Sequence, residues 1–144
     1  MAEPRERKLS DLLKRGYSDD ELSHIYELGR FHLENGELVR AEIIMNGLVA
    51  VAPEFIPAWL ALTYIELMND NIENALNYAK QSHKIDPNNI MAGLFLVTVL
   101  IGIDDVATAG TYLGEVGDLI ESQRETDLSI IRFYRAQLAR FKNS

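Results

Sequence analysis

Three histidines are the side chains of this 144-residue chain best suited to metal chemistry. His24 and His32 stand eight residues apart, and His83 lies far from both, so no His-x3-His or His-Glu-x2-His spacing is present. The chain also has no cysteine, which removes thiolate ligands and any disulfide framework. The sequence therefore predicts no metal site and no cofactor.

Two acidic pairs, Asp19-Asp20 and Asp104-Asp105, could in principle serve as general acids or bases. Both pairs come at the start of stretches with helical periodicity, where carboxylates bind the free N–H groups of the first turn. Helix capping explains them better than catalysis.

Glycine motifs give no better sign of an enzyme. Gly110, Gly114 and Gly117 lie within a helical stretch and follow no strand, which excludes a dinucleotide fingerprint. There is no Gly-x4-Gly-Lys phosphate loop either. We expect these glycines to allow close helix packing, and we expect a protein that is not an enzyme.

The net charge of −8 is unevenly distributed. Residues 1–16 carry five basic and three acidic side chains (net +2), and residues 124–144 carry five and two (net +3). The body between them has four basic and seventeen acidic side chains, a net charge of −13. Because such a body repels phosphate backbones, we expect no nucleic-acid partner.

Membrane and export signals are not apparent in the sequence. No apolar segment follows the charged start of the chain, as a secretory signal would require. The apolar run over residues 91–103 is too short, and too interrupted by glycine, to span a bilayer. We therefore expect a cytoplasmic protein without stable membrane insertion.

A pattern that recurs every 34 residues organises the chain. The step relates five landmarks of one copy to the next: Ile25 to Trp59, Leu28 to Leu62, Leu38 to Ile72, Ala41 to Ala75 and Pro53 to Pro87. The small residue suits a close helix crossing, and the proline ends the second helix because it lacks an N–H. A helix-turn-helix unit of about 34 residues resembles the tetratricopeptide repeat. The alternative is an ordinary helical bundle with a chance periodicity.

A third, weaker copy follows. Another step of 34 relates Trp59 to Gly93, Leu62 to Leu96, Ile72 to Val106, Ala75 to Ala109 and Pro87 to Glu121, so the proline is lost. The last repeat of such an array often departs from the consensus pattern. The resemblance implies an all-α fold of three tetratricopeptide repeats in a right-handed superhelical array, with extra helices at both ends. The expected units are an N-terminal helix (1–16), the repeats (17–121, with copies at about 22–55, 56–89 and 90–123) and a capping helix (124–144).

The periodicity places about eight helices and no strand. Ser18 and Glu21 form a capping box before the first repeat, and Asn35-Gly36 forms its turn. The helix beginning at Ile90 is apolar nearly all round, so it should be the most buried. Helices are expected over residues 4–15, 19–34, 37–51, 72–85, 90–101, 105–121 and 126–141, and another holds Pro57 in its first turn and ends near Met68.

In tetratricopeptide arrays the first helix of each pair lines a concave face that holds an extended peptide or a helix. The resemblance implies a groove lined by Tyr26, Arg30, Leu33, Leu60, Tyr64, Leu67, Met68, Met91, Leu94, Thr98 and Ile101. This face is mostly apolar and aromatic. Members that clamp a C-terminal carboxylate use a lysine and asparagines there, whereas this chain offers only Arg30. Leu67 and Leu94 could instead belong to the core, and Tyr26 and Tyr64 are the foremost site residues.

The stretches Gly16-Tyr17-Ser18-Asp19-Asp20-Glu21-Leu22 and Gly36-Glu37-Leu38-x2-Ala41-Glu42 narrow the resemblance. Together with the helix order, they resemble the small cytoplasmic chaperones of type III secretion translocators. The resemblance implies a role in bacterial virulence and a client held by a short apolar segment, the client being a secreted translocator. The alternative is a general interaction scaffold or assembly factor, such as a needle-subunit chaperone, without a membrane-inserting client.

Leu9, Leu12 and Leu13 form an apolar stripe near the N-terminus. A helix of about a dozen residues is marginal alone, so the stripe should pack on something. The partner is either the acidic body of the same chain or a second copy. We favour a homodimer, which the resemblance also implies.

Overall fold

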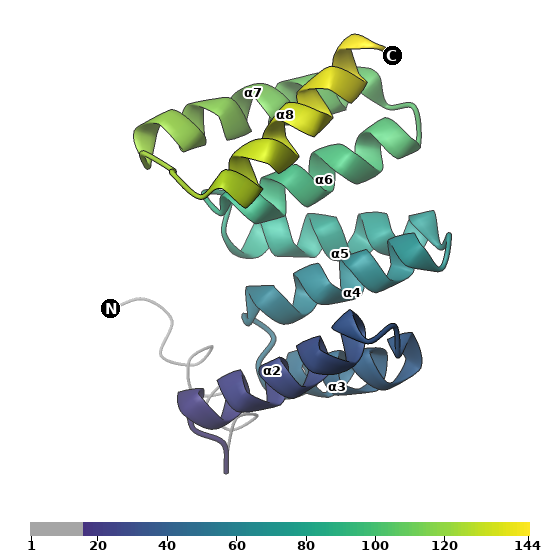
Figure 1. Ribbon diagram of the computed structural model, residues 1–144, viewed down its shortest axis with the longest axis vertical. Coiled ribbons are helices and arrows are strands. Elements are labelled where there is room, and N and C mark those ends of the chain that lie inside the picture. Colours follow the sequence, from purple (N-terminus) through teal and green to yellow (C-terminus); the bar gives the residue numbers. More distant parts are fainter. Residues whose placement is uncertain (1–15) are drawn as a thin grey trace.

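The computed structural model describes residues 16–144. This part of the chain forms helices and no strand, and the helices stack in order from one end of the molecule to the other (Figure 1). The helix expected over residues 4–15, with Leu9, Leu12 and Leu13, lies outside the described residues. The helices are α2 (Asp19–Glu34), α3 (Leu38–Val51), α4 (Ile56–Met68), α5 (Ile72–Ile85), α6 (Ile90–Gly102), α7 (Val106–Ser122) and α8 (Leu128–Lys142).

The predicted start of α2 is confirmed. Ser18 Oγ accepts a hydrogen bond from the Glu21 backbone N–H, and Glu21 Oε1 accepts one from the Ser18 backbone N–H, both at 3.1 Å. This reciprocal arrangement is the capping box, which satisfies two N–H groups that the helix itself leaves free.

Proline determines where the second helix of the first two pairs ends. α3 and α5 each have 14 residues and end two residues before Pro53 and Pro87. α7 has Glu121 at the equivalent position, and it has 17 residues and continues to Ser122. Proline disfavours the helical conformation of the preceding residue, so losing it lets α7 extend.

The turn inside each pair keeps one backbone geometry. Gly36, Asp70 and Asp104 stand 34 residues apart, and their φ angles are 76°, 57° and 62°, all left-handed. The expectation that both aspartates of the 104–105 pair cap α7 is therefore wrong for Asp104, whose backbone makes the turn. Only Asp105 caps the helix, since its Oδ1 accepts from the Thr108 N–H at 3.3 Å.

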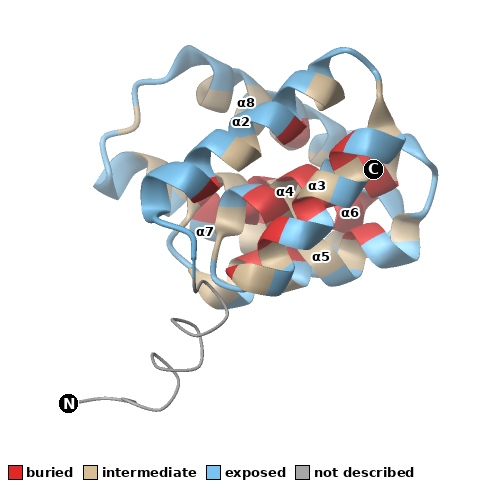
Figure 2. Cartoon of the chain, turned by 90° about the horizontal axis from the view of Figure 1, so that it is seen from below, coloured by how far each residue is buried: buried red, intermediate tan, exposed pale blue. Residues whose placement is uncertain are grey.

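The core follows the 34-residue step. Ala41, Ala75 and Ala109 are all 0% exposed, which confirms the predicted small-residue positions. α6 is the most buried helix, as its apolar sequence predicts. Figure 2 shows its buried residues gathered with those of α3 and α4 in the middle of the array. Burial on this scale is the main stabilising contribution to such a fold.

The prediction that glycines of the third repeat allow close helix packing holds at some positions and fails at Gly114. A Cβ on Gly93 would come within 2.6 Å of Val116 Cγ2, so α7 packs directly against the backbone of α6 at the position where the second repeat has Trp59. A Cβ on Gly110 would lie 2.9 Å from the ring of Phe141, and one on Gly117 would lie 2.9 Å from the hydroxyl oxygen of Tyr134. Gly114 has nothing within 4 Å, so the packing explanation is wrong there.

α8 closes the C-terminal end of the array, lying against α6 and α7 (Figure 1). Phe133 meets Phe95 of α6 edge-on, with ring centroids 5.5 Å apart. The outward face carries Arg132, Arg135 and Arg140, all exposed, as a capping helix requires. Within the described part of the chain, no helix is long and apolar enough to cross a membrane.

Candidate peptide-binding groove

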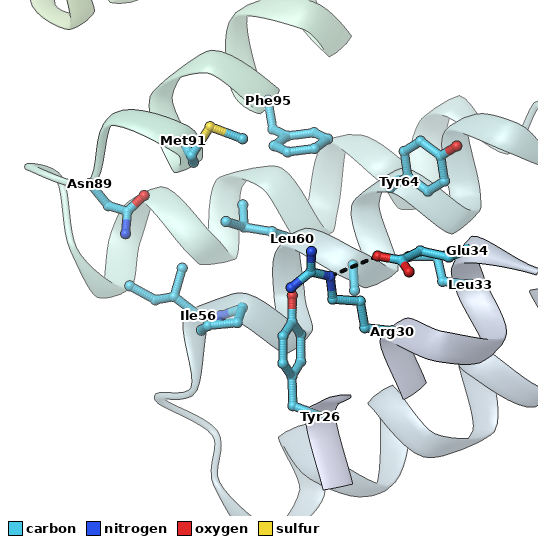
Figure 3. A pocket seen from close by; sticks show the side chains of 12 residues that line it. Tyr26, Arg30, Leu33, Glu34, Ile56, Leu60, Tyr64, Asn89, Met91 and Phe95 are labelled. Carbon is cyan, nitrogen blue, oxygen red and sulfur yellow. Dashed lines mark hydrogen bonds and ion pairs between the residues drawn. The ribbon is translucent and has the colours of Figure 1, made fainter. Parts of the chain in front are cut away.

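A pocket with a volume of about 470 Å³ opens between the first helices of the three pairs. α2, α4 and α6 all contribute side chains, so the pocket exists only because the three repeats stack (Figure 3). The residues that line it are Tyr26, Arg30, Leu33, Glu34, Ile56, Pro57, Leu60, Ala61, Tyr64, Asn89, Met91 and Phe95.

The central helix forms the floor and its neighbours form the walls. Leu60 of α4 lies between Tyr26 of α2 and the pair Met91 and Phe95 of α6, and Tyr64 extends the floor to one side (Figure 3). Tyrosine and methionine present large apolar surface that adapts to different side chains. The arrangement suits an apolar segment that lies across three helices.

Tyr26 is held in place before any ligand arrives. Its ring meets Phe55 edge-on, with centroids 5.7 Å apart and planes at 64°. Burial raises the pKa of the Tyr26 phenol above its usual value, and the charge of Arg30 opposes this effect. The side chain therefore offers an uncharged ring and hydroxyl at physiological pH.

Three polar residues of the pocket, Arg30, Glu34 and Asn89, are already bonded within the chain. Arg30 donates from Nε to Glu34 Oε1 at 3.0 Å, and its guanidinium lies 3.7 Å from Glu27 Oε1. The hydrogen bond to Glu34, followed by the charges of Glu34 and Glu27, raises the pKa of Arg30. Asn89 Oδ1 accepts from the Ala92 N–H at 2.9 Å. Among the described residues, Arg30 is the only basic residue that lines the pocket, and its guanidinium already faces two carboxylates.

Six of the sequence-predicted groove residues line this pocket, namely Tyr26, Arg30, Leu33, Leu60, Tyr64 and Met91. Leu94 was expected to line the groove, but the structure places it fully buried in a cluster with Ile90 and Val116. Leu67 lies outside the pocket and packs against the core cluster that α5, α6 and α7 form. Thr98, Met68 and Ile101 also lie outside it, with the Thr98 hydroxyl donating to the Leu94 carbonyl at 2.7 Å and Ile101 buried.

Phe95 is a pocket residue that the sequence prediction missed. The prediction followed the 34-residue step from Tyr26 through Leu60 to Leu94, which is buried. The residue equivalent to Phe95 in the second repeat is Ala61, which also lines the pocket. The 3.6-residue period of α6 itself does identify Phe95, one turn beyond Met91.

No protein-family model matches the sequence. Over 90 residues the chain is 34% identical to the peroxisomal targeting signal receptor of Eremothecium gossypii. That match covers 62% of this chain but 16% of the receptor, so the chain spans only a small part of this curated relative.

Solved structures establish the fold. The type III secretion translocator chaperone SycD of Yersinia enterocolitica superposes with a TM-score of 0.77 at 17% identity, over 90% of this chain and 96% of that one. A type III secretion complex from Aeromonas hydrophila gives 0.75 at 13% identity, over 96% and 94%. The TPR2B domain of yeast Sti1, in complex with pHsp70, gives 0.69 at 14% identity, over 82% and 96%. The described chain thus has the all-α tetratricopeptide fold, which confirms the prediction and excludes an unrelated bundle.

Proposed function

We propose that the protein is a non-catalytic chaperone that holds an apolar segment of a client protein in the pocket between α2, α4 and α6. The observation that carries the proposal is the composition of that pocket, in which apolar and aromatic side chains of three repeats converge. Its arginine is already paired with carboxylates, so affinity would come from apolar burial rather than from a salt bridge with the client.

The specific client we propose is a translocator of a bacterial type III secretion system, kept in the cytoplasm until export. The likeness to SycD along 90% of this chain and 96% of that one supports this assignment. The competing function is a general scaffold that binds a subunit of another assembly. The likeness to the Sti1 domain supports this alternative, since that domain has the same fold and is in complex with pHsp70.

Capture from the native cell separates the two functions. The full chain is used as bait, and the retained proteins are identified by mass spectrometry. A client with membrane-spanning segments supports the translocator chaperone. A subunit of a soluble assembly, without such segments, supports the scaffold instead.

The groove itself is tested by truncating its aromatic residues. We expect Tyr64→Ala to weaken binding of a fluorescein-labelled, proline- and leucine-containing peptide at least about tenfold, or about 1.4 kcal/mol, with helical content unchanged. Phe95→Ala should have a similar effect, and Tyr64→Phe should bind almost normally if the ring is the anchor. Fluorescence anisotropy measures the affinity, and circular dichroism measures the helical content.

Two controls make this result interpretable. Leu128→Ala removes an exposed apolar residue on α8, and Glu73→Ala removes an exposed charge on α5, so neither should change affinity. Apolar binding should also survive added salt, although exposed charges are screened beyond about 10 Å at 0.1 M. Normal binding by Tyr64→Ala and Tyr26→Ala, with binding lost in salt, would place the client on the acidic surface instead.

A further inference from the structure

The side of the first repeat that faces away from α4 exposes apolar side chains. Leu28 of α2 and Val39 and Ile43 of α3 are all exposed, and Tyr17 before α2 is exposed as well. A second cavity, of about 310 Å³, lies among them and is lined by Tyr17, Ile25, Ile43, Ile44, Gly47, Leu48 and Val51. We call this surface the outer face of the first repeat. Contiguous apolar surface of this kind typically marks an interaction site.

The repeat frame indicates what covers the outer face. Leu28, Leu62 and Leu96 are equivalent, yet Leu28 is 53% exposed while Leu62 and Leu96 are 0% and 2% exposed. Leu62 packs in one cluster with Met45 and Leu48 of α3. Leu96 packs in the same way with residues of α5. In each case the leucine packs against the helix that immediately precedes its own helix in the chain. The described residues include no helix before α2, so nothing covers Leu28 in this way.

The segment that precedes α2 is residues 1–15, and its sequence fits the vacant position. Leu9 and Leu12 are three residues apart, as Met45 and Leu48 are in α3. Leu12 comes seven residues before the start of α2, and Leu48 comes eight residues before the start of α4. We propose that residues 1–15 pack through Leu9, Leu12 and Leu13 onto the outer face of the first repeat in the same chain.

Chain connectivity favours the same chain over a second copy. Residue 15 is joined through Gly16 to Tyr17, which itself lines the cavity. A short tether gives a docking segment a millimolar effective concentration, which a separate molecule rarely reaches. Charge also suits this position, since the segment carries five basic and three acidic side chains and the first turn of α2 exposes Asp19, Asp20 and Glu21. This assignment is the alternative to the homodimer that we favoured from the sequence, and the experiments below distinguish the two.

A double-mutant cycle in the full-length chain tests the contact. We expect Leu12→Ala to lower the urea midpoint of unfolding, and to lower it much less in a chain that already carries Leu28→Ala. The result should not change when the protein concentration is raised a hundredfold. In the matched control, Leu12→Ala and Leu128→Ala should shift the midpoint additively, because Leu128 is similarly exposed but lies on α8 at the other end of the array.

Two outcomes would overturn the proposal. Additive effects of Leu12→Ala and Leu28→Ala would mean that the two leucines do not meet. Coupling that strengthens with protein concentration would mean that a second copy covers the outer face.

Crosslinking gives an independent measurement, because the chain has no cysteine of its own. A chain with Leu12→Cys and Ile43→Cys should be joined within one molecule by a short bis-maleimide, and a chain with Leu12→Cys and Leu128→Cys should not. Peptide mapping identifies the linked residues, and mass reports whether they belong to one chain. Linked dimers from a mixture of the single variants Leu12→Cys and Ile43→Cys would overturn the proposal, as would the absence of any link.

Discussion

The first and second repeats meet where α3 packs against α4, and the second and third repeats meet where α5 packs against α6. We call these interfaces the first seam and the second seam. They use equivalent positions but different chemistry. In the first seam, the carboxyl group of Glu42 of α3 lies beside that of Glu66 of α4, and Glu66 is buried. One step of 34 residues later, the equivalent positions in the second seam hold Leu76 of α5 and Leu100 of α6, and both belong to the apolar core. The repeat frame thus fixes where side chains lie without fixing their chemistry.

The difference makes the first seam sensitive to pH. The hydrogen bond to Glu66 raises the pKa of Glu42, and burial and the charge of Glu66 add to the effect. Two neighbouring carboxyl groups share a proton more readily than they both ionise. Burial, and then the two carboxylates, also raise the pKa of Tyr78. We therefore expect the first seam to hold the first repeat, which forms one wall of the pocket, less firmly as the pH rises toward neutrality.

The largest expected effect comes from giving the second seam the chemistry of the first. Leu100→Glu would place a carboxylate among apolar side chains without the partner that Glu66 has in Glu42. An uncompensated buried charge costs about 3–5 kcal/mol, so we expect a large fall in the free energy of unfolding. Urea unfolding at pH 7 measures it. Ala107→Glu is the control, since this exposed position of α7 has Glu73 as its equivalent in α5 and should tolerate the change; a similar loss in both variants would contradict the comparison.

A smaller effect is expected from overpacking the helix crossings. Ala75→Leu adds three carbons to a fully buried site beside the apolar second seam, and overpacking typically costs about 1–3 kcal/mol. Ala41→Leu is the counterpart in the first repeat, and its cost should be lower because the polar first seam yields more easily. Thermal melting followed by circular dichroism compares the two. An unchanged melting temperature for Ala75→Leu would mean that the crossing does not depend on a small residue.

The fold was predictable from the sequence because the features that determine it are local and recur. Helix ends follow Pro53 and Pro87, and the buried crossings follow Ala41 and Ala75. These signals act within one helix or between adjacent helices, so a 34-residue step transfers them accurately.

The site was only partly predictable because it depends on how the helices are rotated in the assembled array. Leu94 was expected in the groove and is buried, while Phe95 beside it lines the pocket. Asp104 was expected to cap a helix and instead forms a left-handed turn, a role that only the equivalence with Gly36 indicates. The pairing of Glu42 with Glu66 also had no sequence signal, because the two residues meet only through tertiary packing.

The smallest effect tests the first seam directly through pH. Because the folded state raises the pKa of Glu42 above its ordinary value of 4.5, the native protein binds this proton more tightly than the unfolded chain. The stabilising contribution is therefore fully present below the ordinary pKa and is lost as the pH rises through the folded pKa. Near neutral pH, a neutral residue in place of one carboxylate should stabilise the seam.

Glu66→Gln makes that replacement while keeping the shape of the side chain and a group that can donate to Glu42. We expect a free energy of unfolding slightly above that of the unaltered chain at pH 7, and a weaker loss of stability between about pH 4 and pH 7. Urea titrations across this range measure both quantities. Glu73→Gln, an exposed change on α5, should leave the pH profile as it was. If Glu66→Gln lowers stability at pH 7 and leaves the profile unchanged, the two carboxyl groups do not share a proton and the contrast between the seams rests on packing alone.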